Sequence, residues 1–269
     1  MARAKSLVQL LINIHRMNFN LPFLPDRTEK PRQSGITIMT DRGLGVSETE
    51  SFTEGNAPYT DFVKMAFGTA ALIPSLESKL NIYEASKINC YFGGTLFELF
   101  ARRDAIEEYW RYLDKFGMEY IEISDAAIRL ARAEKLKYIN DFSKEFVVIG
   151  QVTNFLPVGL FSFDLLLKFI SEELEAGARY VIVKESEQIP LYGSGGLATY
   201  LSLNPGLVNN QADNIIWDAP EKEQQIELIN IFGSNVNLCN VAPNDVLALE
   251  AIRLGLHSST LSALIAEKK

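Results

Sequence analysis

The chain has 269 residues, 47% of them hydrophobic, which is enough apolar material to bury one large core, so a single main domain is expected. Its formal net charge is −8 and no run of Lys and Arg occurs, which argues against a nucleic-acid-binding surface. Cys90 and Cys239 lie in apolar runs with no Cys or His nearby at metal-ligand spacing, so buried thiols in a reducing cytoplasm are expected.

The first 33 residues predict an amphipathic helix followed by an extended lead-in. The apolar run Ser6–Ile14 is interrupted by Gln9 and Asn13 and has no clear small-residue cleavage site, so it favours a helix over a signal peptide. Residues Asn20–Gln33 are rich in proline and charge, which excludes a helix. No other stretch is long enough to span a bilayer. The apolar face of the first helix would serve either self-association or capping of the lower end of the domain, through Leu7, Leu10, Leu11 and Ile14.

From residue 34 to residue 269, short apolar strands alternate with helical patterns. The strands are uniformly apolar, as expected when helices cover both faces of a parallel sheet. Eight strands separated by helices indicate a parallel α/β architecture, and eight is the number that closes a barrel, so we predict a (β/α)8 TIM barrel rather than an open sheet. The expected strands are Ile36–Thr40, Phe62–Phe67, Asn89–Phe92, Tyr120–Ser124, Phe146–Val152, Tyr180–Val183, Asn214–Trp217 and Val236–Val241.

Helices are expected between these strands, and residues Ser186–Gly206 form the most loop-like part of the chain. Gly117, Gly177 and Gly233 mark helix ends, as glycine commonly does. The expected helices are Pro74–Lys87, Thr95–Phe116, Asp125 to about Asn140, Phe163–Glu175, Glu221–Ile231, Pro243–Leu254 and a tail from Ser259.

The stretch Asn89–Glu98, NCYFGGTLFE, predicts a strand that turns sharply into a helix. Gly93 and Gly94 let the backbone turn and approach a ligand closely, and Thr95 supplies a hydroxyl for the N-cap. The free N–H groups of the helix start would suit a phosphate or carboxylate. A capped turn without a ligand explains the same residues, so both interpretations stay open.

Polar residues at the carboxyl ends of the strands are the candidates for chemistry, because barrel enzymes work at that end. Lys64 and Glu122 lie within strands among apolar neighbours, so each must face the barrel mouth or pair with another charge. Lys64 paired with Asp41 or Glu122 would be either a structural ion pair or part of a ligand site. His257 follows a helical stretch and is expected at a helix end. Five carboxylates could together hold a hard divalent cation, although no local spacing requires it: Asp41, Glu98, Glu122, Asp125 and Asp218.

Five segments carry a likeness to a known family. They are KPRQSGITIMTDRGLG (Lys30–Gly45), DFVKMAFGTAAL (Asp61–Leu72), FGGTLFE (Phe92–Glu98), IEISD (Ile121–Asp125) and the stretch Trp217–Leu256. The chain after about Pro22 resembles the phosphosulfolactate synthase family. The resemblance implies a TIM-barrel lyase that uses Mg²⁺ to add sulfite to phosphoenolpyruvate, an early step toward coenzyme M.

The resemblance also implies roles for particular residues around a small anionic substrate. The expected catalytic residues are Lys64, Arg42 and Lys184, which would hold the anion, and a lysine would deliver the proton. Mg²⁺ would lie among Asp41, Glu98, Glu122 and Asp125. Substrate-binding residues would be Gly93, Gly94, Thr95, Ser124, Asn240 and His257.

Three segments depart from the family pattern. The family has Glu-Val-Gly-Lys-Lys where this chain has Gln151–Phe155, and Glu-Gly/Ala-Arg-Glu-Ser-Gly where it has Lys184–Ile189. The family's Gly-Leu-Arg-Gly-Asp-Thr is replaced by Gly255–Thr260. Each lost cation would weaken binding of a phosphate or carboxylate. The alternative is therefore a divergent member with another small anionic substrate, or a non-catalytic binding or stress-related protein of the same fold.

Overall fold

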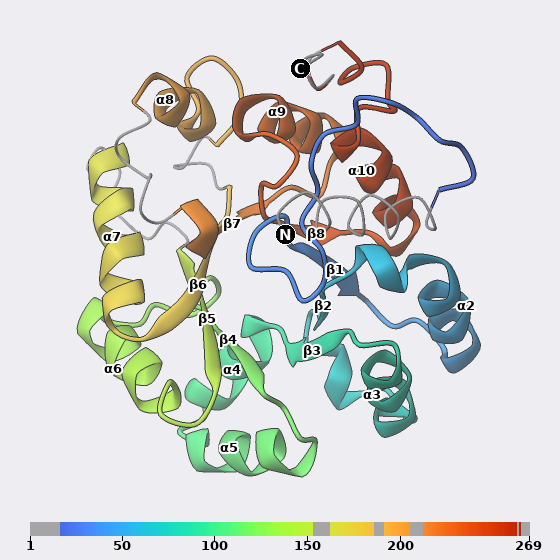
Figure 1. The fold of residues 1–269 in the computed structure, drawn as a ribbon. Helices are drawn as coiled ribbons and strands as arrows, with labels where there is room; N and C mark the ends of the chain where they lie inside the picture. The colour runs from blue at the N-terminus through green and yellow to red at the C-terminus, as the bar shows by residue number, and fades with distance from the viewer. Residues whose placement is uncertain (1–16, 153–161, 186–190, 205–211, 263, 265–269) are drawn as a thin grey trace, which may run out of the picture.

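The structure, a computed structural model, describes residues 17–152, 162–185, 191–204, 212–262 and 264. Parallel strands close a barrel in the order β1 to β8, with β1 paired to β8, and the helices lie outside the ring of strands (Figure 1). The predicted (β/α)8 barrel is confirmed. The strands are β1 (Thr37–Asp41), β2 (Phe62–Met65), β3 (Asn89–Phe92), β4 (Tyr120–Ile123), β5 (Val147–Val152), β6 (Ala178–Val183), β7 (Ile215–Asp218) and β8 (Leu238–Val241).

The helices differ from the expected ones after β1, β3, β4 and β6. After β6, helix α8 (Leu197–Leu203) lies in the stretch Ser186–Gly206 that was expected to be a loop. A helix that was not predicted, α2, follows β1, and the single helix expected through Phe116 is two helices separated at residues 102–105. The helix after β4 begins at Arg132 instead of Asp125, because residues 124–131 form a loop. Residues 259–262 form turns where a helix was expected. The α-helices are α2 (Val46–Asn56), α3 (Leu76–Ala85), α4 (Gly94–Ala101), α5 (Ile106–Lys115), α6 (Arg132–Phe142), α7 (Phe163–Glu175), α8 (Leu197–Leu203), α9 (Lys222–Phe232) and α10 (Val246–Arg253), with 3₁₀ turns η1 (Ala57–Tyr59), η2 (Thr69–Ala71), η4 (Ala212–Asn214) and η5 (Pro243–Asp245).

Side chains fill the barrel interior in layers taken from alternate strands, as the side-chain alternation along a strand requires. The ring of Phe62 packs against Tyr120 and Tyr180 at centroid distances of 4.9 and 6.4 Å. Two residues further along β2 and β4 are Lys64 and Glu122, which therefore point into the barrel as well. The interior is apolar toward the amino ends of the strands and becomes charged at the carboxyl ends. The buried apolar residues inside the ring are Ile36, Ile38, Phe62, Tyr91, Ile149, Tyr180, Ile182, Ile216 and Cys239.

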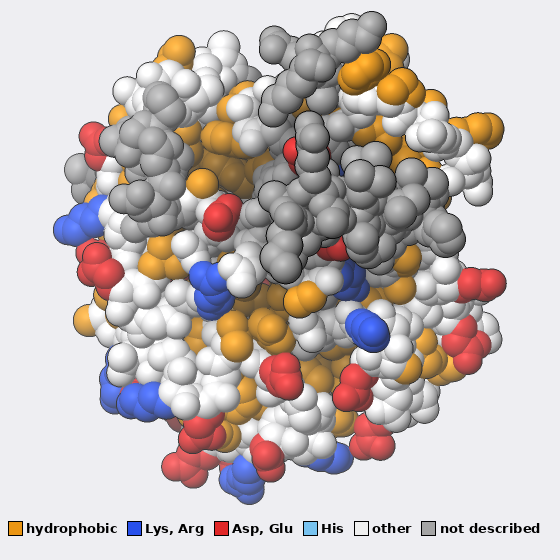
Figure 2. All heavy atoms as spheres, in the orientation of Figure 1, with side chains coloured by type: hydrophobic (Ala, Val, Ile, Leu, Met, Phe, Trp, Pro, Cys, Tyr) orange, Lys and Arg blue, Asp and Glu red, His pale blue; other side chains and the backbone are white. Residues whose placement is uncertain are grey.

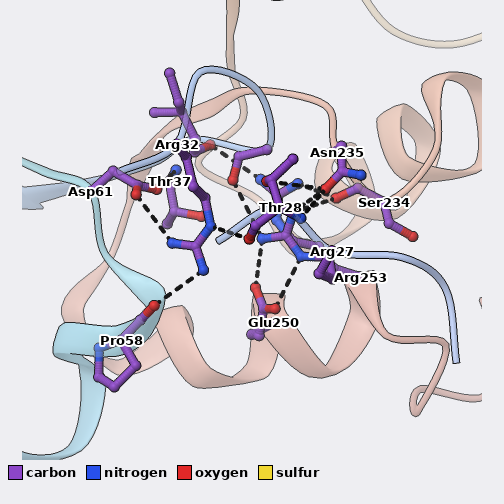
Figure 3. Close-up of polar contacts among 12 residues, drawn as sticks. Arg27, Thr28, Arg32, Thr37, Pro58, Asp61, Ser234, Asn235, Glu250 and Arg253 are labelled. Carbon is purple, nitrogen blue, oxygen red and sulfur yellow. Dashed lines mark hydrogen bonds and ion pairs between the residues drawn. The ribbon is translucent and has the colours of Figure 1, made fainter. Parts of the chain in front are cut away.

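The lead-in is hydrogen bonded across the amino end of the barrel (Figure 3). Arg27 donates from Nε and Nη2 to the two carboxylate oxygens of Glu250 at 3.0 and 2.9 Å. Arg32 pairs with Asp61 at 3.1 Å, and the fully buried Arg253 donates to the carbonyls of residues 234 and 236 at 2.7 Å each. These contacts fasten residues 27–35 to α10 and to the starts of β1, β2 and β8. The predicted apolar face from Leu7 to Ile14 lies outside the described residues.

The described surface carries charges of both signs. Figure 2 shows Lys and Arg side chains interspersed with Asp and Glu on one face, without a continuous basic patch among the described side chains. Among the helices of the described residues, none combines the length and the apolar character needed to cross a membrane.

The Arg27–Glu250 pair predicts a pH-dependent stability. Burial alone raises the pKa of Glu250, but the hydrogen bonds and charge of Arg27 outweigh it, so the pKa lies below its ordinary value of 4.5. A lowered pKa in the folded state stabilises the fold above pH 4.5, and this contribution is lost as the pH falls through the folded-state pKa. We expect Glu250→Gln to lower the free energy of unfolding by about 3 kcal/mol at pH 7.

The measurement is urea unfolding from pH 7 to pH 3, with Glu107→Gln on the exposed face of α5 as the matched control. The difference between wild type and Glu250→Gln should shrink below pH 4.5, the ordinary pKa of the carboxyl group. A difference that stays constant over the whole pH range would show that Glu250 contributes packing rather than charge.

Candidate functional site

The centre of the barrel mouth is an ion pair between Lys64 of β2 and Glu122 of β4. Lys64 Nζ lies 2.9 Å from Oε1 and 2.8 Å from Oε2 of Glu122, and the two side chains are 20% and 1% exposed. Burial lowers the pKa of Lys64, but Glu122, with smaller contributions from Cys239 and Asp218, raises it above its ordinary value of 10.5. Lys64 therefore stays protonated at neutral pH. Of the two partners proposed for Lys64, the structure selects Glu122.

The two glycines after β3 make room for this pair. A Cβ on Gly93 would lie 2.9 Å from Cε of Lys64, so the absence of a side chain there lets Lys64 extend across β3 to β4. A Cβ on Gly94 would lie 2.2 Å from Ser124 Oγ and 2.9 Å from Glu122 Oε1. From the sequence, the glycines served either a ligand that approaches the backbone or a capped turn without a ligand. In the structure they let protein side chains approach the backbone, and these side chains form the mouth.

A second carboxylate, Asp218 at the end of β7, faces the same space. Burial raises the pKa of Asp218, and the charges of Lys184 and Lys64 and a hydrogen bond from Asn240 oppose the shift without cancelling it. The Oδ1 atom of Asn240 accepts a hydrogen bond of 3.0 Å from Thr40 Oγ1. Asn240 has a φ of 65°, an uncommon conformation for a residue other than glycine. The mouth thus gathers two cations and two carboxylates from β2, β4, β7 and the residue that follows β6, with Asn240 linking β1, β7 and β8.

Asp41 does not reach Lys64, because it points out of the barrel toward α3. Its side chain is fully buried, and Oδ2 lies 2.6 Å from Lys79 Nζ and accepts a hydrogen bond of 2.9 Å from the Tyr83 hydroxyl. Oδ1 accepts hydrogen bonds from the backbone N–H groups of Gly43 and Leu44 at 2.7 and 2.9 Å. Asp41 therefore holds the turn after β1, which carries Arg42.

Glu98 and Asp125, two more of the expected metal ligands, also have partners of their own. The Glu98 carboxylate accepts hydrogen bonds from Ser124 and from the backbone of residues 126–128. Asp125 lies 2.8 Å from Lys135 Nζ. In the described ranges, no group of three or more His, Cys, Asp or Glu side chains could hold a metal ion. The four expected ligands are therefore not gathered around one point, and of them Glu122 faces the mouth.

The remaining predicted residues are spread over the molecule. Thr95 is exposed in the first turn of α4, whose N-cap position belongs to Gly93 rather than Thr95. The Arg42 guanidinium lies over the ring of Phe67, 5.3 Å from its centroid, at the rim. His257 follows the carboxyl end of α10. At that end of the helix, Arg253 contacts the backbone just before β1 and β8. His257 is thus at the opposite end of the barrel from the mouth.

Three further residues of the mouth are Asp218, Thr40 and Gln151; the sequence pointed to Asp218 as a possible cation ligand and placed Gln151 at a strand end, whereas Thr40 was not singled out. All three are buried. Each lies two residues beyond a buried interior isoleucine, namely Ile216, Ile38 and Ile149. Because side chains alternate along a strand, the residue two positions after an inward-facing isoleucine also faces inward. This alternation is the sequence signal that identifies them.

The sequence of this chain matches one family of known proteins over most of its length. Residues 25–259 match the model of the (2R)-phospho-3-sulfolactate synthase family. The phosphosulfolactate synthase of Bacillus subtilis (strain 168) is 37% identical over 246 residues, covering 88% of this chain and 96% of that protein. The chain belongs to the phosphosulfolactate synthase family.

A further comparison supports the family, and one with a solved structure supports the fold. The phosphosulfolactate synthase of Methanothermobacter thermautotrophicus is 34% identical over 245 residues, covering 88% of this chain and 95% of that protein. A solved structure of 3-hexulose-6-phosphate synthase from Salmonella typhimurium superimposes with a TM-score of 0.50 at 14% identity, over 82% of this chain and all of that chain. The latter likeness concerns the fold alone.

The contact between Gly93 and Lys64 predicts the effect of a single methyl group. Gly93 has φ −64° and ψ 153°, which alanine adopts readily, so Gly93→Ala tests crowding alone. We expect the variant to lower the free energy of unfolding by about 1–3 kcal/mol, as overpacking does. Chemical denaturation measures the change.

Gly55→Ala is the matched control, because a Cβ there meets no atom within 4 Å. It should leave the stability unchanged or raise it slightly. In a Lys64→Ala background the cost of Gly93→Ala should fall, because only the contact of 3.2 Å with the Met65 carbonyl oxygen then remains. An unchanged cost in that background would show that Lys64 is not what Gly93 accommodates.

Proposed function

We propose that the chain is a lyase that adds sulfite to phosphoenolpyruvate. The observation that carries the proposal is the pair of half-buried Lys64 and buried Glu122 with Lys184 and Asp218 beside it, at the end of the barrel where such enzymes act. A substrate that carries phosphate and carboxylate groups requires cations in a partly desolvated site. Lys64 and Lys184 supply two of them. Family membership supports the same reaction.

The residues of the mouth suit each step of such an addition. The sulfur lone pair of sulfite attacks the methylene carbon of phosphoenolpyruvate, and the carbon–carbon π electrons move toward the carboxylate, giving an enolate-like charge. Protonated Lys64 and Lys184 would stabilise that charge. A proton then adds to the carbon that bears the phosphate, and Lys64 is the proposed donor because its pKa keeps it protonated. Lys64 would regain its proton from solvent.

Mg²⁺ would also be held at the mouth, by carboxylates other than Asp41, Glu98 and Asp125, which have partners of their own. Asp218 is a buried carboxylate whose pKa is raised chiefly by burial, despite the nearby cations Lys184 and Lys64. Asp218 and Glu122 would hold the ion, since Mg²⁺ commonly uses one or two carboxylates and otherwise water and substrate oxygens. When bound, Mg²⁺ supplies electrostatic stabilisation of the enolate-like charge.

Incubation of the purified protein with phosphoenolpyruvate, sulfite and Mg²⁺ tests the proposal, with mass spectrometry to detect the sulfonated product. We expect turnover by the wild type and a loss of roughly 100-fold or more in kcat/KM for Lys64→Met, as removal of a general acid causes. Lys168→Met, on the exposed part of α7, is the matched control and should retain full activity.

Absence of product at every magnesium concentration would contradict the proposed reaction. If phosphoenolpyruvate then still raised the melting temperature, the alternative of a binding protein with the same fold would be favoured, because a ligand that binds only the folded state stabilises it.

A further inference from the structure

The carboxylate of Glu98 is buried and fully hydrogen bonded. Its side chain lies in α4, and the residue is 2% exposed. Oε1 accepts hydrogen bonds from the Ser124 hydroxyl and from the backbone N–H of Ala126, the latter at 3.0 Å. Oε2 accepts from the N–H groups of Ala127 and Ile128 at 2.6 and 2.8 Å. Successive backbone N–H groups that converge on one carboxylate form the kind of concave anion site that loops offer to phosphates and carboxylates.

No ion pair to Glu98 occurs among the described residues, and the neutral donors of the loop therefore carry the stabilisation of its charge. A buried ion without such donors would be strongly unfavourable. The loop and the carboxylate consequently depend on each other: removal of the carboxylate leaves three backbone N–H groups without their acceptor.

One face of α4 contacts both the end of β4 and the loop that follows it. Gly94 and Glu98 are four residues apart and so lie one above the other on the helix. Gly94 lets Ser124 and Glu122 approach the helix, because a Cβ at Gly94 would overlap both side chains. Four residues later, Glu98 binds the loop that Ser124 begins. The orientation of Glu122 toward the mouth is thus set by the same helix face.

The far side of the same loop is held from α6. Lys135 is 1% exposed, and its Nζ lies 2.8 Å from Asp125 and 2.9 Å from Glu173, and donates to the Gln151 carbonyl at 2.5 Å. Gly150 provides room for Glu173, because a Cβ there would lie 2.2 Å from Glu173 Oε2. The loop between β4 and α6 is therefore anchored to α4 on one side and to α6 and α7 on the other.

We propose that Glu98 is a positioning residue: it binds the β4–α6 loop as an internal carboxylate ligand and thereby orients Ser124 and Glu122, and through Glu122 the ammonium group of Lys64. The effect on catalysis rests on the proposed function, whereas the binding of the loop does not. All four hydrogen bonds of the carboxylate come from the protein, so its role differs from the metal ligation expected from the sequence.

Three variants test the proposal. Glu98→Gln keeps the volume but turns one acceptor into a donor, which opposes the N–H groups of the loop. Glu98→Ala leaves a space into which added acetate can place a carboxylate. Glu107→Gln makes the same chemical change on the exposed face of the neighbouring helix α5 and is the matched control.

The first measurement is the hydrogen-exchange rate of the backbone amides of residues 126–128. The second is kcat and KM with phosphoenolpyruvate and sulfite as substrates. Glu98→Gln should speed exchange at these amides roughly tenfold or more, as loss of a charge-assisted hydrogen bond implies, and leave the other barrel amides unchanged. It should lower kcat/KM by roughly tenfold or more, mainly through kcat.

Sodium acetate should restore amide protection and activity to Glu98→Ala but not to Glu98→Gln, whose side chain fills the site, and sodium chloride at equal ionic strength should restore neither. If Glu98→Ala does not fold, exchange and a crystal structure of Glu98→Gln carry the test.

Unchanged exchange at residues 126–128 in Glu98→Gln would overturn the binding of the loop. Faster exchange with an unchanged kcat/KM, or with an unchanged Lys64–Glu122 contact in the crystal structure, would overturn the positioning role. If the wild type gives no product, the proposed function fails by itself, and the exchange measurement together with the position of Glu122 in the variant structure still decides the role of Glu98.

Discussion

The ion pair between Lys64 and Glu122 is the interaction on which the site depends. Removing a lysine and a glutamate from water is costly, and an ion pair repays that cost only with close geometry. The structure provides such geometry, because both carboxylate oxygens lie within 3 Å of Nζ, at 2.9 and 2.8 Å. The ion pair also explains why residue 93 is a glycine, because a side chain there would collide with Lys64 where it crosses from β2 to β4. This one charge pair thus accounts for Lys64 in β2, Gly93 directly after β3 and Glu122 in β4.

The segments that depart from the family pattern do not all lie at the barrel mouth. The replacement at Gly255–Thr260 was expected to remove an Arg and an Asp from the site. Because His257 follows the end of α10 that contacts the starts of β1 and β8, this replacement lies at the amino end of the barrel. Lys184, by contrast, acts on the charge of Asp218 and therefore adds a cation to the mouth. Of the three replaced segments, Gly255–Thr260 therefore lies away from the mouth, whereas residues 153–155 and 186–189 of the other two lie outside the described residues.

The architecture could be predicted from the sequence because buried parallel strands are uniformly apolar, and six of the seven expected helical segments contain helices in the structure. The same uniformity hides which side chains point inward. Asp41 ends β1 and Lys64 lies within β2, and both strands are otherwise apolar. Asp41 nevertheless shares the outward face with Met39, whereas Lys64 shares the inward face with Phe62. The prediction of a helix in the β4–α6 loop was wrong. The residue that stabilises this loop, Glu98, lies 26 residues before Ser124 in the chain, so the local sequence does not reveal it. Long-range partners of this kind leave no local pattern.

A double-mutant cycle in the free energy of unfolding, with Lys64→Met, Glu122→Gln and the double variant, tests the central claim most directly. Each single variant leaves a buried group without its partner and should cost about 3–5 kcal/mol. The double variant should cost less than the sum of the two, with a coupling energy on the order of 1–3 kcal/mol. Strictly additive costs would contradict the account, because they would show that the two side chains do not interact in the folded protein.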